Sequence, residues 1–360
     1  MATTPTRRHF LQSAAGGVLA AATMPTTGLG SAPRFDVVIR GGTIVDGTGS
    51  RGSRNDLGIR GDRVAAIGNL ADADTKRSVN ATGRIVCPGF IDMHSHSDSS
   101  LLEDGLAHSA VRQGATTHVI GNCGSSPAPV GSPVRLAGHT LSTYGDFLKA
   151  LQKNGTSINV CGLVGHNSVR RAVMGTQNRQ PTSVELRQMQ DLVDEAMRSG
   201  AVGLSTGLVS PPGIYSKTDE IVALARVAAR HGGQYSSHIR GEASTLVQAV
   251  GEAIQVGREA GLPVQISHHK AAGREKWGTT GKTLPMIEAA NRNGQRVRVD
   301  VYPYQSRKRG NGPIGTALGT RRRQRRVAGP TERSRAATED CPRHGSRNGQ
   351  LAELLQDRMG

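Results

Sequence analysis

Short apolar runs alternate with helical stretches over most of the chain after residue 84. Each run has the length of a buried strand, and a segment with helical periodicity separates it from the next. This alternation is typical of βα units, whose parallel strands form one sheet that helices cover. The predicted strands lie near residues 85–93, 116–121, 157–164, 201–205, 233–238, 263–268 and 296–302. They predict an α/β fold, a (β/α)8 TIM-type barrel that lacks its eighth unit.

Three of the intervening helices have recognisable ends. Residues 182–197 open with Thr182-Ser183-Val184-Glu185, a hydroxyl side chain followed by glutamate, and stop at Gly200. Residues 219–231 and 243–260 are also followed by glycine. These signals predict helices of ordinary length between the strands.

A different pattern precedes the βα units. Residues 35–47 predict two short strands around Gly41-Gly42, and residues 56–68 predict two more around Gly61-Asp62. Polarity alternates along them, as it does in antiparallel strands with one wet face. We therefore expect a small N-terminal β-sandwich part.

The first residues are typical of an export signal. Residues 6–11, Thr-Arg-Arg-His-Phe-Leu, contain paired arginines, and an apolar run rich in alanine and glycine extends from Ala14 to Met24. That run is too short to be a stable membrane span. It predicts twin-arginine export to the periplasm or the medium, with cleavage between Ala22 and Pro33. A disordered basic start is the alternative.

Part of the net charge of +17 lies near the C-terminus. Residues 306–360 hold 13 Lys and Arg residues against 5 acidic ones, and five of the arginines fall within residues 321–326. No aromatic residue interleaves with them and no recognition motif is present, so we expect no nucleic-acid partner. This composition is typical of a translated wrong reading frame, with a disordered basic tail as the alternative.

These patterns divide the chain into four predicted parts. They are a signal segment at 1–32, a small β domain at 33–84, the barrel at 85–305 and the basic tail at 306–360. The cysteines, Cys87, Cys123, Cys161 and Cys341, have no disulfide-framework spacing, and a domain of this size needs no disulfides. Their thiols are therefore available to bind metal.

Candidate metal ligands follow four of the predicted strands. His94 and His96 end the first strand, and their spacing presents both imidazoles on one side. Cys123 follows the second strand, His238 ends the fifth and His268 ends the sixth. Any one of them alone is more often a core or hydrogen-bonded residue. Because the carboxyl ends of barrel strands meet at one face, together they predict a metal site.

Five motifs carry a family resemblance. They are Gly89-Phe90-Ile91-Asp92-Met93-His94-Ser95-His96, Gly121-Asn122-Cys123-Gly124, Gly203-Leu204-Ser205-Thr206-Gly207-Leu208, Ser237-His238-Ile239-Arg240-Gly241-Glu242 and Ile266-Ser267-His268-His269-Lys270. With them, residues 35–305 resemble the D-aminoacylase (N-acyl-D-amino-acid amidohydrolase) family of the amidohydrolase superfamily. The hydantoinase and dihydroorotase branch instead uses a carboxylated lysine on the fourth strand, where Gly203-Leu204-Ser205 offers none.

The resemblance implies a zinc enzyme. It assigns a tight zinc site to Cys123, His238 and His268, and a second, weaker metal position to His94 and His96. One thiolate and two imidazoles suit Zn2+ and leave a coordination position open. The zinc would polarise the amide carbonyl and lower the pKa of the attacking water.

The resemblance also implies substrate-binding residues and a general base. Lys270 matches the residue that binds the substrate carboxylate, with Tyr302 assisting it, whereas an ordinary loop lysine is the alternative. The family's general base is an aspartate at the end of the eighth strand, downstream of Tyr304. Asp340 lies in no matching context. No catalytic residue is therefore identified.

The implied activity is zinc-dependent hydrolysis of the amide bond of a small molecule, an N-acyl-D-amino acid, to give a carboxylate and a D-amino acid. One alternative is a related peptidase that acts on dipeptides containing D-amino acids. Another is an inactive, truncated amidohydrolase that at most binds zinc. The absent aspartate distinguishes the active from the inactive hypothesis, and the sequence does not give the oligomeric state.

Overall fold

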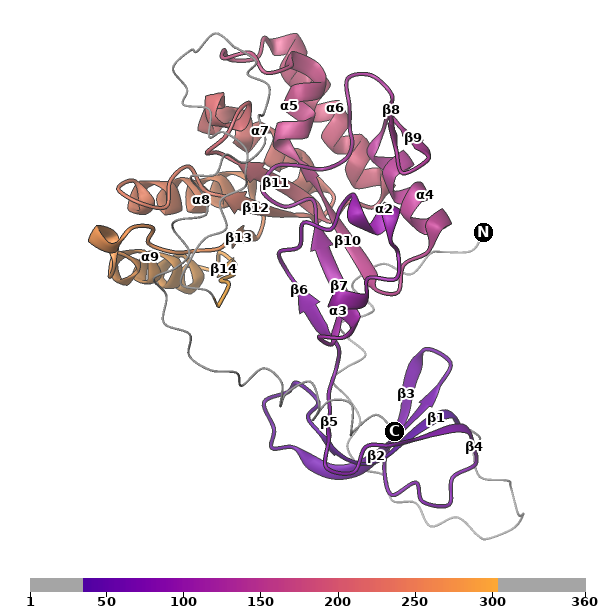
Figure 1. Ribbon diagram of the computed structural model, residues 1–360. Helices are drawn as coiled ribbons and strands as arrows, with labels where there is room; N and C mark the ends of the chain where they lie inside the picture. The colour runs from indigo at the N-terminus through magenta and orange to yellow at the C-terminus, as the bar shows by residue number, and fades with distance from the viewer. Residues whose placement is uncertain (1–34, 304–360) are drawn as a thin grey trace, which may run out of the picture. The chain divides into compact units, whose positions relative to one another are not determined.

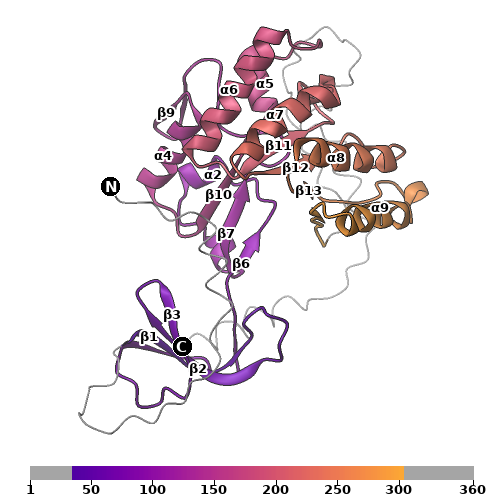
Figure 2. The same cartoon turned by 180° about the vertical axis from the view of Figure 1, so that it is seen from behind.

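The computed structural model describes residues 35–303, which Figures 1 and 2 show from opposite sides. The paired-arginine segment and the basic tail lie outside the described residues, so the export and reading-frame hypotheses stay predictions. Within residues 35–303, none of the helices combines the length and the apolar composition that crossing a bilayer requires.

A five-stranded sheet forms the N-terminal part. Its strands are β1 (Phe35–Ile44), β2 (Ser53–Arg60), β3 (Arg63–Gly68), β4 (Thr75–Asn80) and β5 (Ile85–Val86). The order is β3-β2-β1-β4, and β5 also pairs with β1. β2 and β3 form the predicted antiparallel pair around Gly61-Asp62. β1, however, runs parallel to β4 and β5, and the sandwich arrangement itself stays a prediction.

The prediction of two strands around Gly41-Gly42 is wrong. β1 runs through both glycines, and its pairing with β2 shifts register between Ile39 and Gly42, as at a β-bulge. Gly41 has a φ of +67°, which glycine adopts without steric cost. A Cβ on Gly42 would lie 2.6 Å from the Val86 side chain. The two glycines therefore mark a bulge and a close packing contact.

The second sheet consists of seven parallel strands. They are β6 (Phe90–Asp92), β7 (Ala115–Ile120), β10 (Asn159–Gly165), β11 (Gly203–Gly207), β12 (Gln234–His238), β13 (Val264–Ile266) and β14 (Val297–Val299). Each strand pairs with the next along the chain, so β6 and β14 are the edges of the sheet over the described residues. The predicted α/β, barrel-type fold is confirmed.

Helices cover one face of this sheet (Figure 1). The longer ones are α4 (Tyr144–Asn154), α5 (His166–Met174), α6 (Ser183–Ser199), α7 (Thr218–Arg230), α8 (Leu246–Ala260) and α9 (Thr280–Arg292). The shorter elements are α2 (Ser100–Glu103), α3 (His108–Val111), η1 (Gly213–Tyr215), η2 (Arg274–Lys276) and the hairpin of β8 (Val134–Leu136) and β9 (His139–Leu141). The three predicted helices are confirmed as α6, α7 and α8, with ends that differ from the predicted ones by at most three residues.

The apolar core lies between the helices and the strands. Leu204 on β11 and Ile266 on β13 are fully buried there, with Leu224 on α7 and Val250 on α8. Burial of such side chains is the main stabilising contribution to a domain of this size.

The strands also bury hydroxyl groups that bond to one another. Thr206 Oγ1 and Ser237 Oγ lie 2.9 Å apart, and Ser236 Oγ lies 3.3 Å from Ser267 Oγ. These pairs join neighbouring strands at or near their carboxyl ends. The strand ends are thereby held at fixed separations, which is what a site built from several strands requires.

Substituting Thr182 tests the predicted start of α6. The Thr182 hydroxyl accepts the Glu185 N–H at 3.2 Å, and the Glu185 carboxylate accepts the Thr182 N–H at 2.8 Å. Thr182→Ala removes one of these bonds, so we expect the free energy of unfolding to fall by about 1 kcal/mol. Thr182→Ser keeps the hydroxyl, so its free energy of unfolding should fall much less. Equal denaturation midpoints for the two variants would contradict a capping role.

Candidate metal centre

The predicted ligands meet at the carboxyl ends of the parallel strands. His94 lies two residues after β6, Cys123 three after β7 and His268 two after β13, while His238 is the last residue of β12. Two groups of potential ligand atoms form there, each within 4.8 Å. One contains His94, Cys123 and His268, and the other contains His238, Glu242 and His268. His268 is common to both groups.

The distances in the first group suit a tetrahedral ion. Cys123 Sγ lies 3.3 Å from His94 Nε2 and 3.6 Å from His268 Nε2. Sulfur and nitrogen ligands of tetrahedral zinc are separated by about 3.3–3.7 Å, given their usual bond lengths. His238 Nδ1 lies 2.8 Å from His268 Nε2, on the side of the second group. The donor set of thiol and imidazoles therefore fits the predicted metal.

His96 belongs to neither group. Its side chain is exposed, and its ring centroid lies 5.2 Å from that of His94. The structure thus places His94 in contact with Cys123, whereas His96 lies beside His94 and outside both ligand groups. The division of ligands into a tight and a weaker site stays a prediction.

The turn that carries Cys123 is closely fitted to its neighbours. Cys123 has a φ of +54°, a conformation that residues other than glycine rarely adopt outside functional sites. The Asn122 side chain donates to the Val119 carbonyl at 2.8 Å, and the Gly124 N–H donates to Ser205 Oγ at 3.0 Å. A Cβ on Gly124 would lie 2.5 Å from the Gly207 nitrogen. These contacts fix where the thiol points.

Burial keeps the Cys123 thiol protonated in the absence of a cation. Desolvation, with the negative charges of Asp300 and Glu242 adding to it, raises the pKa of Cys123 to about 12. A divalent cation reverses this effect, because the thiolate becomes its ligand. The thiol is therefore suited to binding metal rather than to acting as a free nucleophile.

Two carboxylates in the site were not predicted from the sequence. Glu242 lies 2.5 Å from Lys270 Nζ and 2.7 Å from His268 Nδ1. Desolvation opposes its ionisation, yet the hydrogen bonds from His268 and Lys270 lower its pKa to about 2. Glu242 ends one of the family motifs, and this position was the available signal.

Asp300 is the second unpredicted carboxylate, directly after β14. It contacts His94 Nδ1 at 3.1 Å and accepts the His268 N–H at 2.6 Å and the Gln265 amide at 2.9 Å. Desolvation again opposes ionisation, but these bonds lower the pKa of Asp300. Its position at a strand end was the signal that could have identified it.

Lys270 and Tyr302 lie beside the ligand groups. Lys270 Nζ is 5.2 Å from the centroid of the Tyr302 ring and 3.0 Å from the carbonyl oxygen of His268. The Tyr302 ring centroid is 6.5 Å from that of His268. A cation and an aromatic ring thus border the candidate centre.

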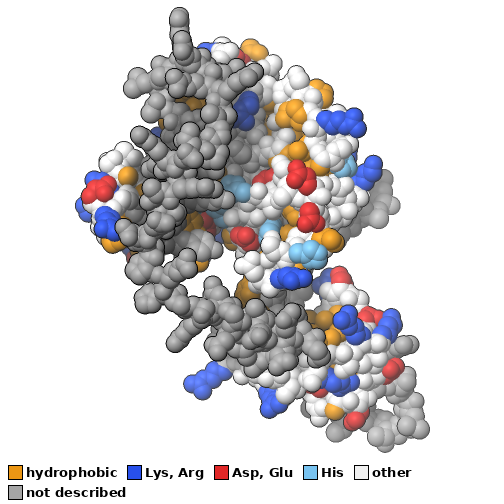
Figure 3. Space-filling model, in the orientation of Figure 1, with side chains coloured by type: hydrophobic (Ala, Val, Ile, Leu, Met, Phe, Trp, Pro, Cys, Tyr) orange, Lys and Arg blue, Asp and Glu red, His pale blue; other side chains and the backbone are white. Residues whose placement is uncertain are grey.

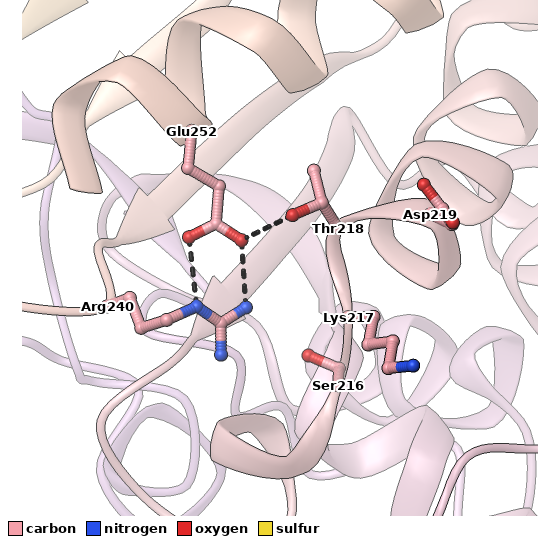
Figure 4. A pocket seen from close by; sticks show the side chains of 6 residues that line it. All are labelled: Ser216, Lys217, Thr218, Asp219, Arg240 and Glu252. Carbon is pink, nitrogen blue, oxygen red and sulfur yellow. Dashed lines mark hydrogen bonds and ion pairs between the residues drawn. The ribbon is translucent and has the colours of Figure 1, made fainter. Parts of the chain in front are cut away.

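A polar pocket of about 430 Å³ is lined by residues outside the ligand groups, as Figure 4 shows. Arg240 Nε and Nη2 donate to the Glu252 carboxylate, each at 2.9 Å. Thr218 Oγ1 donates to the same carboxylate at 2.9 Å. Since these groups satisfy one another, we assign the pocket no part in the chemistry.

Figure 3 shows the side chains of the described residues on one face of the molecule. Lysine and arginine lie there among acidic and uncharged side chains.

Two curated proteins are similar to most of this chain. The chain is 43% identical over 279 residues to D-aminoacylase and 41% identical over 280 residues to N-acyl-D-glutamate deacylase, both from Alcaligenes xylosoxydans xylosoxydans. Each match covers 75% of this chain and 57% of the relative.

A solved structure is also similar to this chain. It is that of N-acyl-D-glutamate deacylase from Bordetella bronchiseptica, complexed with zinc and a phosphonate inhibitor that mimics the tetrahedral intermediate. The TM-score is 0.72 at 39% identity, covering 76% of this chain and 59% of that one.

The chain therefore spans a little under three fifths of the length of these relatives. A sequence model described as "Amidohydrolase family" matches residues 77–338. This match and the relatives confirm the resemblance predicted from the motifs: the chain belongs to the amidohydrolase family.

Proposed function

We propose that the chain binds zinc at Cys123 and its neighbouring histidines and acts in the hydrolysis of N-acyl-D-amino acids. The convergence of the Cys123 thiol with His94 Nε2 and His268 Nε2, at 3.3 and 3.6 Å, is the observation that carries the proposal. The activities of the relatives, a D-aminoacylase and an N-acyl-D-glutamate deacylase, give the substrate class. The products are a carboxylate and a D-amino acid.

Zinc is the metal that this donor set favours. Thiolate with imidazole is the usual ligand combination for zinc, and the similar deacylase structure contains zinc. When bound, zinc polarises the amide carbonyl and makes water more acidic. We propose one tight site that includes Cys123 and His268. His94, His96 and His238 supply the other nitrogen ligands of this site and those of a second, weaker ion.

Lys270 supports recognition of the substrate carboxylate. Its ammonium has three donors, of which one bonds to Glu242 at 2.5 Å and another to the His268 carbonyl oxygen at 3.0 Å. A further donor can bind a substrate carboxylate, while the Tyr302 ring beside it limits the directions of approach. Glu242 also contacts His268 Nδ1, which holds its carboxylate beside the metal ligands. The bond from Lys270 to this carboxylate therefore fixes the lysine at the edge of the candidate metal centre.

The reaction also needs a group that takes a proton from water. The resemblance implies an aspartate at the end of an eighth strand, but the sequence has no aspartate in that context downstream of Tyr304, and Asp340 lies outside the described residues. A chain that binds zinc without hydrolysing amides is therefore the alternative outcome, as is a peptidase that acts on dipeptides containing D-amino acids.

Zinc content and hydrolysis of N-acetyl-D-methionine test the proposal together. We expect about one tightly held zinc per purified chain, together with hydrolysis. Cys123→Ser removes the thiolate and should weaken zinc binding at least about tenfold, whereas Cys87→Ser, an exposed cysteine, should change nothing. Zinc bound without hydrolysis would favour the inactive alternative. A chain that binds no zinc would overturn the proposal.

Substituting Lys270 tests carboxylate recognition. Lys270→Met removes a charged hydrogen bond, so we expect kcat/KM for N-acetyl-D-methionine to fall about 10- to 100-fold, mainly through KM. Lys282→Met, an exposed lysine on α9, is the matched control. The loss should shrink for the amide of the same substrate, which has no carboxylate. An equal loss for both substrates would point to a structural role instead.

We also propose that residues 6–11 direct twin-arginine export. The paired arginines Arg7 and Arg8 and the apolar run that follows them support this proposal. Replacing both arginines by lysine should leave the protein in the cytoplasm of an expressing bacterium, as fractionation would measure. Unchanged export of that variant would contradict the proposal.

A further inference from the structure

We propose that Asp300 is a positioning residue. It holds His94 in the tautomer that carries its proton on Nδ1, so that the unprotonated Nε2 faces Cys123. The same bond joins β6 and β14, the edge strands of the parallel sheet within the described residues, at the metal centre. The link to metal rests on the proposed function, whereas the tautomer can be tested in its absence. Asp300 is not among the ligands that the sequence predicted.

Every described group that Asp300 contacts at hydrogen-bond distance can donate to it. The backbone N–H of His268 donates to Oδ1 at 2.6 Å, and the Gln265 amide donates to Oδ2 at 2.9 Å. Oδ1 also lies 3.1 Å from His94 Nδ1. A carboxylate surrounded by donors acts as an acceptor. His94 Nδ1 is therefore the protonated nitrogen of its ring.

This hydrogen bond determines what the other ring nitrogen can do. With the proton on Nδ1, a neutral imidazole has its free electron pair on Nε2, and only that pair can bind a metal. His94 Nε2 lies 3.3 Å from Cys123 Sγ. A carboxylate at the far nitrogen is the common way in which proteins orient a metal-binding histidine.

The bond also connects distant parts of the chain. His94 follows β6 and Asp300 follows β14, which are the edges of the sheet within residues 35–303, and the two residues are 206 positions apart in the sequence. Their side chains are largely buried, with 13% and 16% of their surface exposed, so water competes weakly for the bond. Since Asp300 also holds the backbone of His268, one carboxylate places two residues of the same ligand group.

Glu242 provides a comparison within the same site. It lies 2.7 Å from His268 Nδ1, but Lys270 Nζ also lies 3.1 Å from that nitrogen. An acceptor, Glu242, and a donor, Lys270, therefore compete for His268 Nδ1. At His94 Nδ1 the partner is an acceptor, the Asp300 carboxylate oxygen. Removal of Asp300 should accordingly change the tautomer of His94 more than removal of Glu242 changes that of His268.

Nitrogen NMR of the metal-free, full-length chain labelled with 15N-histidine tests the positioning role. Long-range proton–nitrogen correlations distinguish the two tautomers, and loss of one spin system in His94→Gln assigns the signal. We expect wild-type His94 to carry its proton on Nδ1. In Asp300→Ala the Nε2-protonated form should become the major one, whereas Asp219→Ala, an exposed aspartate on α7, should leave the spectrum unchanged.

Zinc affinity, measured by competition with a chelator, is the second readout. We expect Asp300→Ala to bind zinc about 10- to 100-fold more weakly than wild type. If Asp300→Ala does not fold, Asp300→Asn is the deciding variant. It keeps the shape of the side chain but replaces one acceptor oxygen by a donor amide. The His94 tautomer population and the zinc affinity should then change in the same direction, by a smaller amount.

An unchanged His94 tautomer in a folded Asp300 variant would overturn the positioning role, whatever the zinc affinity. A tautomer that depends on Asp300 in a chain that binds no zinc would support it and would overturn the proposed function instead. The two failures are thus distinguishable.

Discussion

The meeting of Cys123 and His268 is the contact on which the rest of the site depends. Cys123 Sγ and His268 Nε2 lie 3.6 Å apart, and His268 belongs to both ligand groups. Both residues have positive φ angles, +54° and +38°, which are costly for side chains of this size. Such conformations persist only where the surroundings enforce them. Here the bonds of Asn122 and Gly124 hold the Cys123 turn, and the Asp300 carboxylate holds the His268 N–H.

The charges of Glu242 and Asp300 determine how Cys123 and His268 can bind a metal. A half-buried thiol whose pKa desolvation raises to about 12 gives no thiolate by itself, and imidazoles bind a metal only when they are neutral and correctly oriented. Glu242 and Asp300 lie on the far sides of His268 and His94, away from the thiol. Their negative charge favours a cation between the ligands and opposes a free thiolate. The arrangement is therefore poised for a divalent metal rather than for a cysteine nucleophile.

The periodic pattern of the chain predicted most of the fold. Six of the seven parallel strands and three of the helices follow from short apolar runs, cap signals and terminal glycines. The strand predicted at 85–93 is instead divided, because Ile85–Val86 pairs with β1 in the first sheet and only Phe90–Asp92 belongs to the parallel sheet. The β1 bulge did not follow, because Gly41-Gly42 has the same local signature in a bulge as in a turn. Strand direction in the first sheet was also missed, since the parallel pairs of β1 form with distant segments.

The candidate site was predictable only in part, for a different reason. Residues with soft ligand atoms at strand ends stand out in a sequence, and His94, Cys123, His238 and His268 indeed meet there. Glu242 and Asp300 act through hydrogen bonds to those ligands, and such contacts leave no spacing pattern. His96 shows the converse, because an i, i+2 spacing predicts a shared side of a strand but not a shared ligand group.

X-ray absorption at the zinc edge tests the central claim most directly. The zinc-loaded chain should show one sulfur at about 2.3 Å and two or more nitrogens at about 2.0–2.1 Å. The sulfur contribution should disappear when Cys123 is replaced. A first shell of nitrogen and oxygen alone in the unaltered chain would show that the metal does not bind at Cys123, and the metal centre described here would be wrong.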